Sequence, residues 1–242
     1  MAADAIMEVR SLKVSYGSYE AVKGVSFTLK RGGILGIVGE SGSGKSTVAK
    51  TLVGLEKPSS GEILLAQGAS LQMVFQDAAG SLNPRMTVRQ TLSETLRVRR
   101  SKNATPAALL DKVGLSQAVL DQYPGEMSGG QCQRVSVARA LACEPDILVA
   151  DEPVSALDVS VQARVLNLLR DLRRDLGLSI VLIAHDLAVV KNVCDYVCVM
   201  EKGLFAESGP PESVFVNPQS ECAKRLIAAV PAIPQSLSSV SL

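Results

Sequence analysis

The sequence of 242 residues predicts an α/β fold in which helices cover a mainly parallel sheet, with an antiparallel β subdomain at the start and a helical insert in the middle. Short apolar runs alternate with longer amphipathic segments, as in strands that are joined by helical crossovers. A glycine-rich loop joins one apolar run to a helical segment, which is the arrangement of a phosphate-binding loop. The hydrophobic share of 47% without any Trp indicates an aliphatic core.

The first thirty residues are predicted to form β-structure. Residues 7–14 and 22–29 partly alternate between apolar and polar side chains, and Gly17 and Gly24 punctuate them. Beyond this region, short apolar runs that are bounded by turn residues indicate further strands. These runs are residues 34–38, 62–65, 71–75, 147–150, 179–184 and 196–200, followed by a last hairpin strand near Leu204.

The middle of the chain is predicted to be helical. Residues 87–123 carry a helical pattern, with breaks at Gly114 and Pro124. Another helix is expected over residues 128–142, and Ser128 is well placed as its N-cap.

Further helices are expected at residues 48–53, 159–176 and 186–193. The longest of them has one apolar side, and Gly177 closes it. We expect residues 1–230 to form a single domain, in which about 87–142 make up the helical subdomain. The tail, residues 231–242, is expected to be disordered.

The segment from Gly39 to Thr47 fits the pattern G-x-x-x-x-G-K-[ST] of a phosphate-binding P-loop. Its glycines let the backbone wrap a phosphate closely, and several N–H groups and the helix N-terminus then point at the anion. Lys45 can place a positive charge at the β- and γ-phosphates, and the Ser46 hydroxyl can bind Mg²⁺. The binding residues expected in this loop are Gly39, Ser41, Gly42, Ser43, Gly44, Lys45, Ser46 and Thr47.

Two carboxylates, Asp151 and Glu152, follow the apolar run at residues 147–150. At about a hundred residues beyond a P-loop, the first carboxylate is placed to hold Mg²⁺, and the second can orient and activate a water at the γ-phosphate. The pair therefore predicts a site that hydrolyses a nucleotide.

A second anion site is expected where a Ser and two glycines begin the helix at residues 128–142. The sequence Ser128-Gly129-Gly130-Gln131, followed by residues 134–141, closely resembles the signature of ATP-binding cassette (ABC) ATPases. The resemblance covers nearly the whole chain. It implies a P-loop NTPase core of the RecA-like class, ATP and Mg²⁺ as cofactors, and ATP hydrolysis that is coupled to transmembrane transport.

The resemblance also assigns roles that spacing alone does not give. Tyr16 falls where the family places an aromatic ring on adenine, and Gln76 falls on a glutamine that senses Mg²⁺ and the attacking water. His185 matches a histidine that contacts the γ-phosphate. The roles that follow are catalysis by Lys45, Gln76, Glu152 and His185, metal binding by Ser46, Gln76 and Asp151, and nucleotide binding by Tyr16 and, across a dimer, by Ser128, Gly129, Gly130 and Gln131.

Two further stretches, residues 81–88 and 214–219, resemble the branch of ABC ATPases that serves peptide and nickel importers. This resemblance implies transmembrane permease subunits as partners, with a docking cleft near Gln76, Leu82 and Met86. It also implies a second ATPase subunit, the same or a different chain, and indirectly an extracytoplasmic substrate-binding protein. The expected location is peripheral, at the cytoplasmic face of the cell membrane.

Three departures from the family pattern stand out. The stretch between Gly61 and Gln76 is short, so an edge strand or a helix of the core is expected to be missing. Cys132 stands where the family usually has Arg, and Met127 where it usually has Leu. Both changes lie next to the signature, and they leave its Ser–Gly–Gly anion site in place.

The alternative function is that of a soluble ABC ATPase in repair or translation, which usually needs two cassettes or a long coiled-coil arm. The single cassette disfavours it. A net charge of +1 gives no electrostatic case for a nucleic-acid partner. Five cysteines without a C-x-x-C pair and a single His offer no ordinary zinc set, so free thiols are expected.

Overall fold

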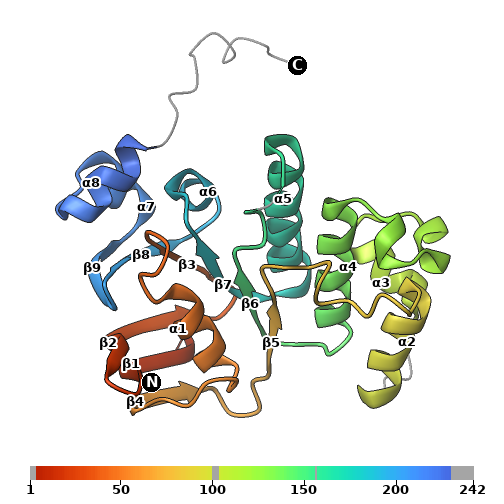
Figure 1. Ribbon diagram of the computed structural model, residues 1–242, viewed down its shortest axis with the longest axis horizontal. Coiled ribbons are helices and arrows are strands. Elements are labelled where there is room, and N and C mark those ends of the chain that lie inside the picture. The colour runs from red at the N-terminus through yellow and green to blue at the C-terminus, as the bar shows by residue number, and fades with distance from the viewer. Residues whose placement is uncertain (1–3, 100–103, 156, 230–242) are drawn as a thin grey trace, which may run out of the picture.

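The computed structural model describes residues 4–99, 104–155 and 157–229, so the expected tail at 231–242 lies outside the described residues. The strands are β1 (Ala5–Tyr16), β2 (Tyr19–Lys30), β3 (Ile34–Val38), β4 (Ser60–Leu65), β5 (Leu71–Val74), β6 (Ile147–Asp151), β7 (Ser179–Ala184), β8 (Tyr196–Glu201) and β9 (Leu204–Gly209). They form one six-stranded sheet in the order β5-β6-β7-β3-β8-β9 and one three-stranded sheet in the order β2-β1-β4. Figure 1 shows the three-stranded sheet at the lower left.

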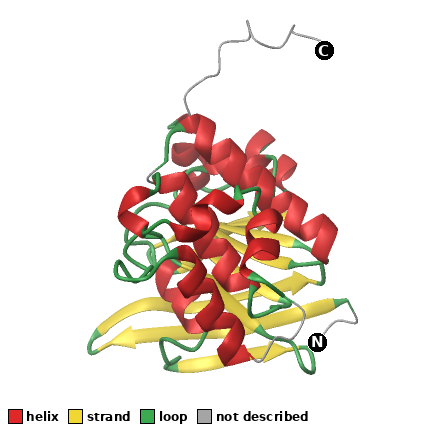
Figure 2. Ribbon diagram, turned by 90° about the vertical axis from the view of Figure 1, so that its right-hand side faces the viewer, coloured by secondary structure: helices red, strands yellow, loops and turns green. Residues whose placement is uncertain are grey.

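The α-helices are α1 (Lys45–Leu52), α2 (Val88–Arg99), α3 (Pro106–Lys112), α4 (Gly129–Leu141), α5 (Val159–Leu176), α6 (Leu187–Lys191), α7 (Pro211–Val216) and α8 (Glu221–Ala228), and two 3₁₀ turns are η1 (Gln117–Asp121) and η2 (Pro124–Glu126). Helices α2, α3 and α4 lie together at the end of the molecule opposite the three-stranded sheet (Figure 1). Figure 2 shows the strands in layers, with most helices above them. The expected α/β fold with an antiparallel part and a helical insert is therefore confirmed.

The larger sheet is parallel from β5 to β8, and β9 adds an antiparallel edge. Alternate residues of its central strands enter two separate cores. In β6, Leu148 and Ala150 pack with α4 and α5, whereas Ile147 and Val149 pack with α1 and the antiparallel sheet. A strand that is apolar on both faces suits this position, because both faces of a parallel sheet are covered.

The helical insert is more divided than the sequence predicts. Residues 87–123 form α2, α3 and η1, and Gly114, at φ 63°, follows the end of α3. The next helix begins as predicted: the Ser128 hydroxyl accepts a hydrogen bond from the Gln131 N–H, and the Gln131 side chain accepts one from the Ser128 N–H. This reciprocal capping box fixes the first turn of α4.

The long helix α5 is confirmed over residues 159–176, and Gly177 ends it in the left-handed conformation at φ 65°. Its N-cap is Asp158, whose carboxylate accepts from the Val161 N–H. The sequence did not predict α7 and α8, and the helix expected at 186–193 is only α6, five residues long. The short connection between the β-subdomain and the main sheet is also visible: residues 66–70 link β4 to β5 directly, without a helix.

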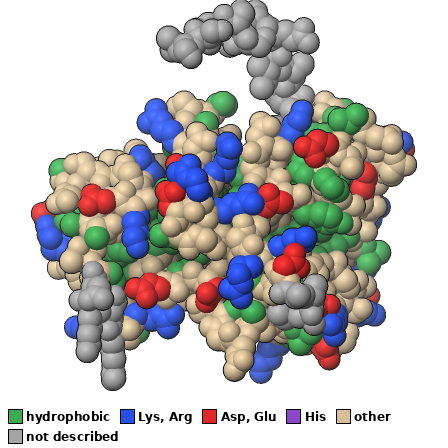
Figure 3. Space-filling view, turned by 180° about the vertical axis from the view of Figure 1, so that it is seen from behind, with side chains coloured by type: hydrophobic (Ala, Val, Ile, Leu, Met, Phe, Trp, Pro, Cys, Tyr) green, Lys and Arg blue, Asp and Glu red, His purple; other side chains and the backbone are tan. Residues whose placement is uncertain are grey.

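Lys and Arg side chains are interspersed with Asp and Glu on the face drawn in Figure 3, so no large area of one charge sign forms there. The described cysteines are all free thiols, and four of them are buried. Among the helices described, none combines the length and the apolar character that crossing a membrane requires.

Candidate active site

The P-loop connects β3 to α1, and two of its glycines are required by the space around them. A Cβ built on Gly39 would collide with the backbone carbonyl oxygen of Met200. Gly44 has a φ of 109°, which disfavours side chains, and its Cβ would lie 2.6 Å from the Ala21 carbonyl oxygen. The loop is therefore packed tightly between β2 and β8.

Lys45 is held inside this loop. Its Nζ donates to the carbonyl oxygens of Gly39, at 2.8 Å, and of Glu40, at 2.9 Å. Only 4% of its surface is exposed, and burial lowers the pKa of the ammonium while the carboxylates of Asp151 and Glu152 oppose that shift. The two hydrogen bonds fix a positive charge at the mouth of the loop.

The first hydroxyl of α1 meets the carboxylate at the end of β6. Ser46 Oγ donates to Asp151 Oδ1 at 3.1 Å, and Asp151 is 4% exposed. Burial raises the pKa of Asp151, because the charged carboxylate loses its hydration. Hydroxyl and carboxylate oxygens are the ligands that Mg²⁺ prefers, so this pair fits a magnesium site.

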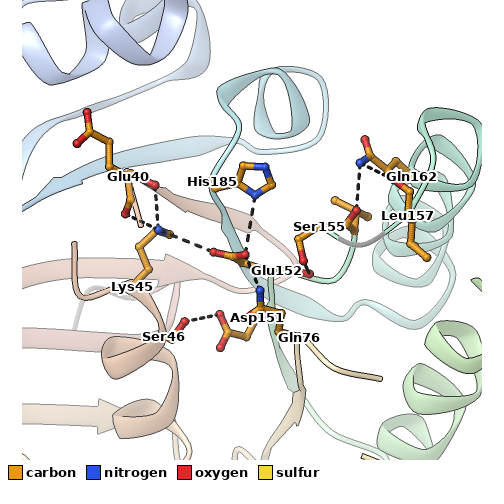
Figure 4. A network of polar contacts seen from close by, with 12 residues as sticks. Glu40, Lys45, Ser46, Gln76, Asp151, Glu152, Ser155, Leu157, Gln162 and His185 are labelled. Carbon is orange, nitrogen blue, oxygen red and sulfur yellow. Dashed lines mark hydrogen bonds and ion pairs between the residues drawn. The ribbon is translucent and has the colours of Figure 1, made fainter. Parts of the chain in front are cut away.

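The Glu152 carboxylate is the point at which the other polar residues converge (Figure 4). Gln76 Nε2 donates to Glu152 Oε2 at 3.0 Å, and Lys45 Nζ lies 3.9 Å from Glu152 Oε1. His185 Nδ1 lies 3.9 Å from Glu152 Oε2. Glu152 has a φ of 44°, a left-handed conformation that costs a non-glycine residue roughly 1–2 kcal/mol. The strained turn at the strand end aims the carboxylate toward the P-loop.

Lys45, Ser46, Gln76 and Glu152 border a cavity of about 340 Å³ in front of the P-loop, whereas Asp151 and His185 are not part of its lining. Its lining is Tyr16, Tyr19, Ala21, Ser41, Gly42, Gly44, Lys45, Ser46, Thr47, Gln76 and Glu152. Tyr16 and Tyr19 belong to the β1–β2 hairpin, and the polar and charged groups come from the P-loop, the start of α1, the turn after β6 and the segment after β5. The sequence did not predict a role for Tyr19 or Ala21, because an aromatic or a small residue in a hairpin carries no signal of its own for ligand binding.

The loop is suited to phosphate in two further respects. The Ser43 hydroxyl, in a residue only 5% exposed, has no hydrogen-bond partner among the described residues. A buried hydroxyl without a partner is costly, and a phosphate oxygen would supply the missing one. Gly42 has a φ of 77°, and no atom lies within 4 Å of the place where its Cβ would be. Because Gly42 has no side chain, the backbone N–H groups of the loop stay accessible to an anion.

The signature residues do not line this cavity. Gly129 borders a second cavity of about 320 Å³, together with Gln76 and Glu152. Gly130 is buried against α5, where an added Cβ would lie 2.5 Å from Val161 Cγ1. The start of α4 thus lies next to the P-loop cavity, but its exposed residues Ser128 and Gly129 do not line that cavity.

The two unusual residues beside the signature fit the helical insert. Cys132 is 2% exposed, and its Sγ donates to the Pro124 carbonyl oxygen at 3.6 Å. Burial raises the pKa of this thiol. Met127 is half-buried and packs against the same core. Both therefore act as apolar packing residues.

Comparison with known proteins agrees with this geometry. The family model "ABC transporter" matches residues 22–155, which is more than half of the chain. The oligopeptide transport ATP-binding protein OppF of Lactococcus lactis is 42% identical over 258 residues, which cover 94% of this chain and 81% of that protein. The alignment of 258 positions is longer than the chain of 242 residues, so the relative carries residues without a counterpart in this chain.

Solved structures show the same fold. CbiO1 of Clostridium perfringens, part of an ABC transporter complex, superposes with a TM-score of 0.77 at 29% identity, over 88% of this chain and 92% of that chain. The cassette MJ0796, a dimer bound to ADP and Pi, gives a TM-score of 0.72 at 26% identity, over 85% of this chain and 98% of that chain. The fold is that of a P-loop NTPase cassette that binds ATP, and the chain belongs to the ABC transporter family.

Proposed function

We propose that this cassette binds Mg–ATP, hydrolyses it, and thereby powers an importer of oligopeptides. The observation that carries the proposal is the convergence of Lys45, Gln76 and His185 on the carboxylate of Glu152, beside the Ser46–Asp151 pair. The Lys45 ammonium, the Ser46 hydroxyl and the Glu152 carboxylate line one cavity at the P-loop. Such a set can neutralise a triphosphate and direct a water at its last phosphorus.

Each residue has a distinct part in the proposed reaction. The Ser46 hydroxyl and the Asp151 carboxylate would hold Mg²⁺, with Gln76 as a further oxygen ligand, and the ion would neutralise charge on the β- and γ-phosphates. The Glu152 carboxylate accepts a hydrogen bond from the attacking water and orients it. Lys45 and His185 stabilise the charge that develops on the γ-phosphate oxygens.

A second cassette completes the site in this proposal. The exposed start of α4, with Ser128 and Gly129, lies outside the P-loop cavity of its own chain. A helix N-terminus is an anion site, so a two-fold pair can bring the signature of one chain to the nucleotide on the P-loop of the other. The dimeric cassette bound to ADP and Pi supports this arrangement.

The cargo and the partners follow from the relatives. The OppF proteins of Lactococcus lactis and of other bacteria are named for oligopeptide transport, which favours peptides over nickel and favours a transporter over a soluble repair or translation ATPase. We place the chain at the cytoplasmic face of the membrane, bound to permease subunits that receive peptide from an extracytoplasmic binding protein.

The segment after β5 is the proposed docking surface for the permease. Arg85 is exposed and Met86 is half-buried, but Leu82 is only 3% exposed and belongs to the core, so it is not available for docking. Ser81 is also engaged: its carbonyl and hydroxyl oxygens accept hydrogen bonds from the Arg139 guanidinium at 2.6 and 3.2 Å. Arg85 is therefore the residue that tests docking without disturbing the fold.

The experiment is uptake of labelled oligopeptide into vesicles that contain this cassette and the permease subunits of an oligopeptide importer. ATP with Mg²⁺ on the cassette side should drive uptake, and Arg85→Glu should reduce uptake while ATP hydrolysis by the isolated cassette stays intact. Arg89→Glu is the control for reversing a charge in this region, because the Arg89 guanidinium is already paired with the Asp121 carboxylate of the helical insert, at 2.9 Å. ATP-driven uptake of nickel but not of peptide would overturn the proposed cargo.

A further inference from the structure

Two of the four tyrosines in this chain flank the turn of the β1–β2 hairpin. Tyr16 ends β1, Tyr19 begins β2, and the two are paired across the strands. Gly17, at φ 61°, lies in the two-residue connection between them. Residues directly opposite in an antiparallel pair project from the same face of the sheet, so the hairpin presents both aromatic side chains together.

Both tyrosines line the P-loop cavity and both are exposed, Tyr16 to 46% and Tyr19 to 61%. Exposed aromatic surface in the lining of a cavity is available for contact with a bound ligand. Burial raises the pKa of the Tyr16 phenol, and the side chains of Thr47 and Glu56 lie beside it. Tyr16 thus lies next to Thr47 of α1, and Tyr19 is the more exposed of the two rings.

The remaining lining of the cavity combines phosphate-binding groups with a small residue. Lys45 and Ser46 begin α1 directly after the P-loop, where a triphosphate would bind, and Ala21 follows Tyr19 by two positions on β2. A flat heterocyclic base stacks on an aromatic ring through its π-face.

We infer that Tyr19 is a second aromatic wall of the base subsite, in addition to the Tyr16 ring, and that it determines how tightly the base is held. The inference rests on the proposed function, because it assumes that the cavity binds ATP by its triphosphate at the P-loop. The family resemblance points only to Tyr16; the role of Tyr19 comes from its pairing with Tyr16 and from its place in the cavity lining.

The test compares two ligands, ATP and inorganic tripolyphosphate, by equilibrium binding in the presence of Mg²⁺. Tyr19→Ala should weaken ATP binding about fivefold, the lower end of what a base–aromatic contact contributes, and should leave tripolyphosphate binding unchanged. Tyr19→Phe, which keeps the ring, should bind ATP like the wild type. Tyr196→Ala is the matched control: Tyr196 is 41% exposed, and it begins β8 opposite Leu35, near the start of β3, whereas the P-loop follows the end of β3.

Three results would overturn the inference. Unchanged ATP affinity in Tyr19→Ala would show that the ring makes no base contact. An equal loss for ATP and tripolyphosphate would show that Tyr19 only supports the shape of the P-loop cavity. If the wild-type chain bound neither ligand, the proposed function would fail and this inference with it, whereas normal wild-type binding with either of the first two results would leave the proposed function standing.

Discussion

Gln76 and Glu152 lie 76 positions apart in the sequence, and Gln76 Nε2 donates a 3.0 Å hydrogen bond to Glu152 Oε2. The bond joins the segment after β5 to the turn after β6. Both residues also border two cavities, one at the P-loop and one beside the start of α4. The pair therefore lies between the P-loop cavity and the cavity at the start of α4. A movement of the exposed segment that carries Gln76 would act directly on the Glu152 carboxylate.

The first prediction concerns this bond. Gln76→Ala should lower kcat at least about tenfold, because the carboxylate that orients water loses a positioning donor. The dissociation constant for ATP should change little, since Lys45 and the P-loop remain. Gln72→Ala, on β5 but outside both cavities, is the control.

A second variant distinguishes an electrostatic effect of residue 76 on Glu152 from a loss of packing at that position. Gln76→Glu would place two carboxylates in contact, which raises the pKa of one of them. The acid limb of the pH–rate profile should then move to higher pH. A profile that coincides with that of the wild type would argue against any electrostatic coupling between these positions.

The second prediction concerns Asp151, whose pKa is raised by burial. The folded chain then keeps a proton on Asp151 to higher pH than the unfolded chain does. Without Mg²⁺, stability should fall as the pH rises from the ordinary Asp value of about 4 through the folded pKa. Asp151→Asn should therefore raise Tm at pH 7 and abolish Mg²⁺-dependent hydrolysis.

Thermal unfolding at several pH values measures this effect. The gain in Tm should disappear toward pH 3, where the wild-type carboxyl group is protonated in both states. Asp146→Asn is the control: Asp146 Oδ2 accepts from the Ser70 N–H and hydroxyl, so its replacement should bring no gain. A lower Tm for Asp151→Asn at pH 7 would contradict the assignment of burial as the dominant influence.

The third prediction compares two glycines of the P-loop. Gly39→Ala should destabilise the fold strongly and remove ATP binding, because the new Cβ meets the rigid carbonyl oxygen of Met200. Gly42→Ala places its Cβ in open space, and its cost should be the roughly 1–2 kcal/mol of a left-handed alanine. Denaturant unfolding gives both values. Equal costs would mean that β8 moves away from the loop.

Local patterns predicted much of this structure. The capping box at Ser128, the end of α5 at Gly177 and the carboxylates at the end of β6 each depend on a few neighbouring residues, and each is found where it was expected. The approach of Asp151, at the end of β6, to Ser46, after β3, follows from the carboxyl ends of parallel strands meeting at one sheet edge.

Other features depend on contacts between distant residues. Helix α8 was not predicted; besides its Ser220 N-cap, it is held by Glu207, which accepts hydrogen bonds from the Ser220 N–H and hydroxyl across the chain. The Gln76–Glu152 bond and the place of Tyr19 likewise depend on how separate strands are arranged. The assignment of roles to Tyr16, Gln76 and His185 required the family resemblance, because their surroundings in the sequence are ordinary.

The central claim is that one ATP is held by the P-loop of one chain and the signature of another. Glu152→Gln should keep ATP binding but block the attack of water, so that the closed pair persists. Adding Ser128→Arg to this variant should separate the pair while ATP stays bound to each P-loop, because in the proposed pair the new side chain would fill the helix start that faces the partner's nucleotide.

The most direct measurement is the molar mass of Glu152→Gln by light scattering, with and without saturating ATP and Mg²⁺. We predict twice the monomer mass with nucleotide, the monomer mass without it, and the monomer mass for Glu152→Gln combined with Ser128→Arg under both conditions. A Glu152→Gln chain that binds ATP and remains a monomer at saturating ATP would contradict the account.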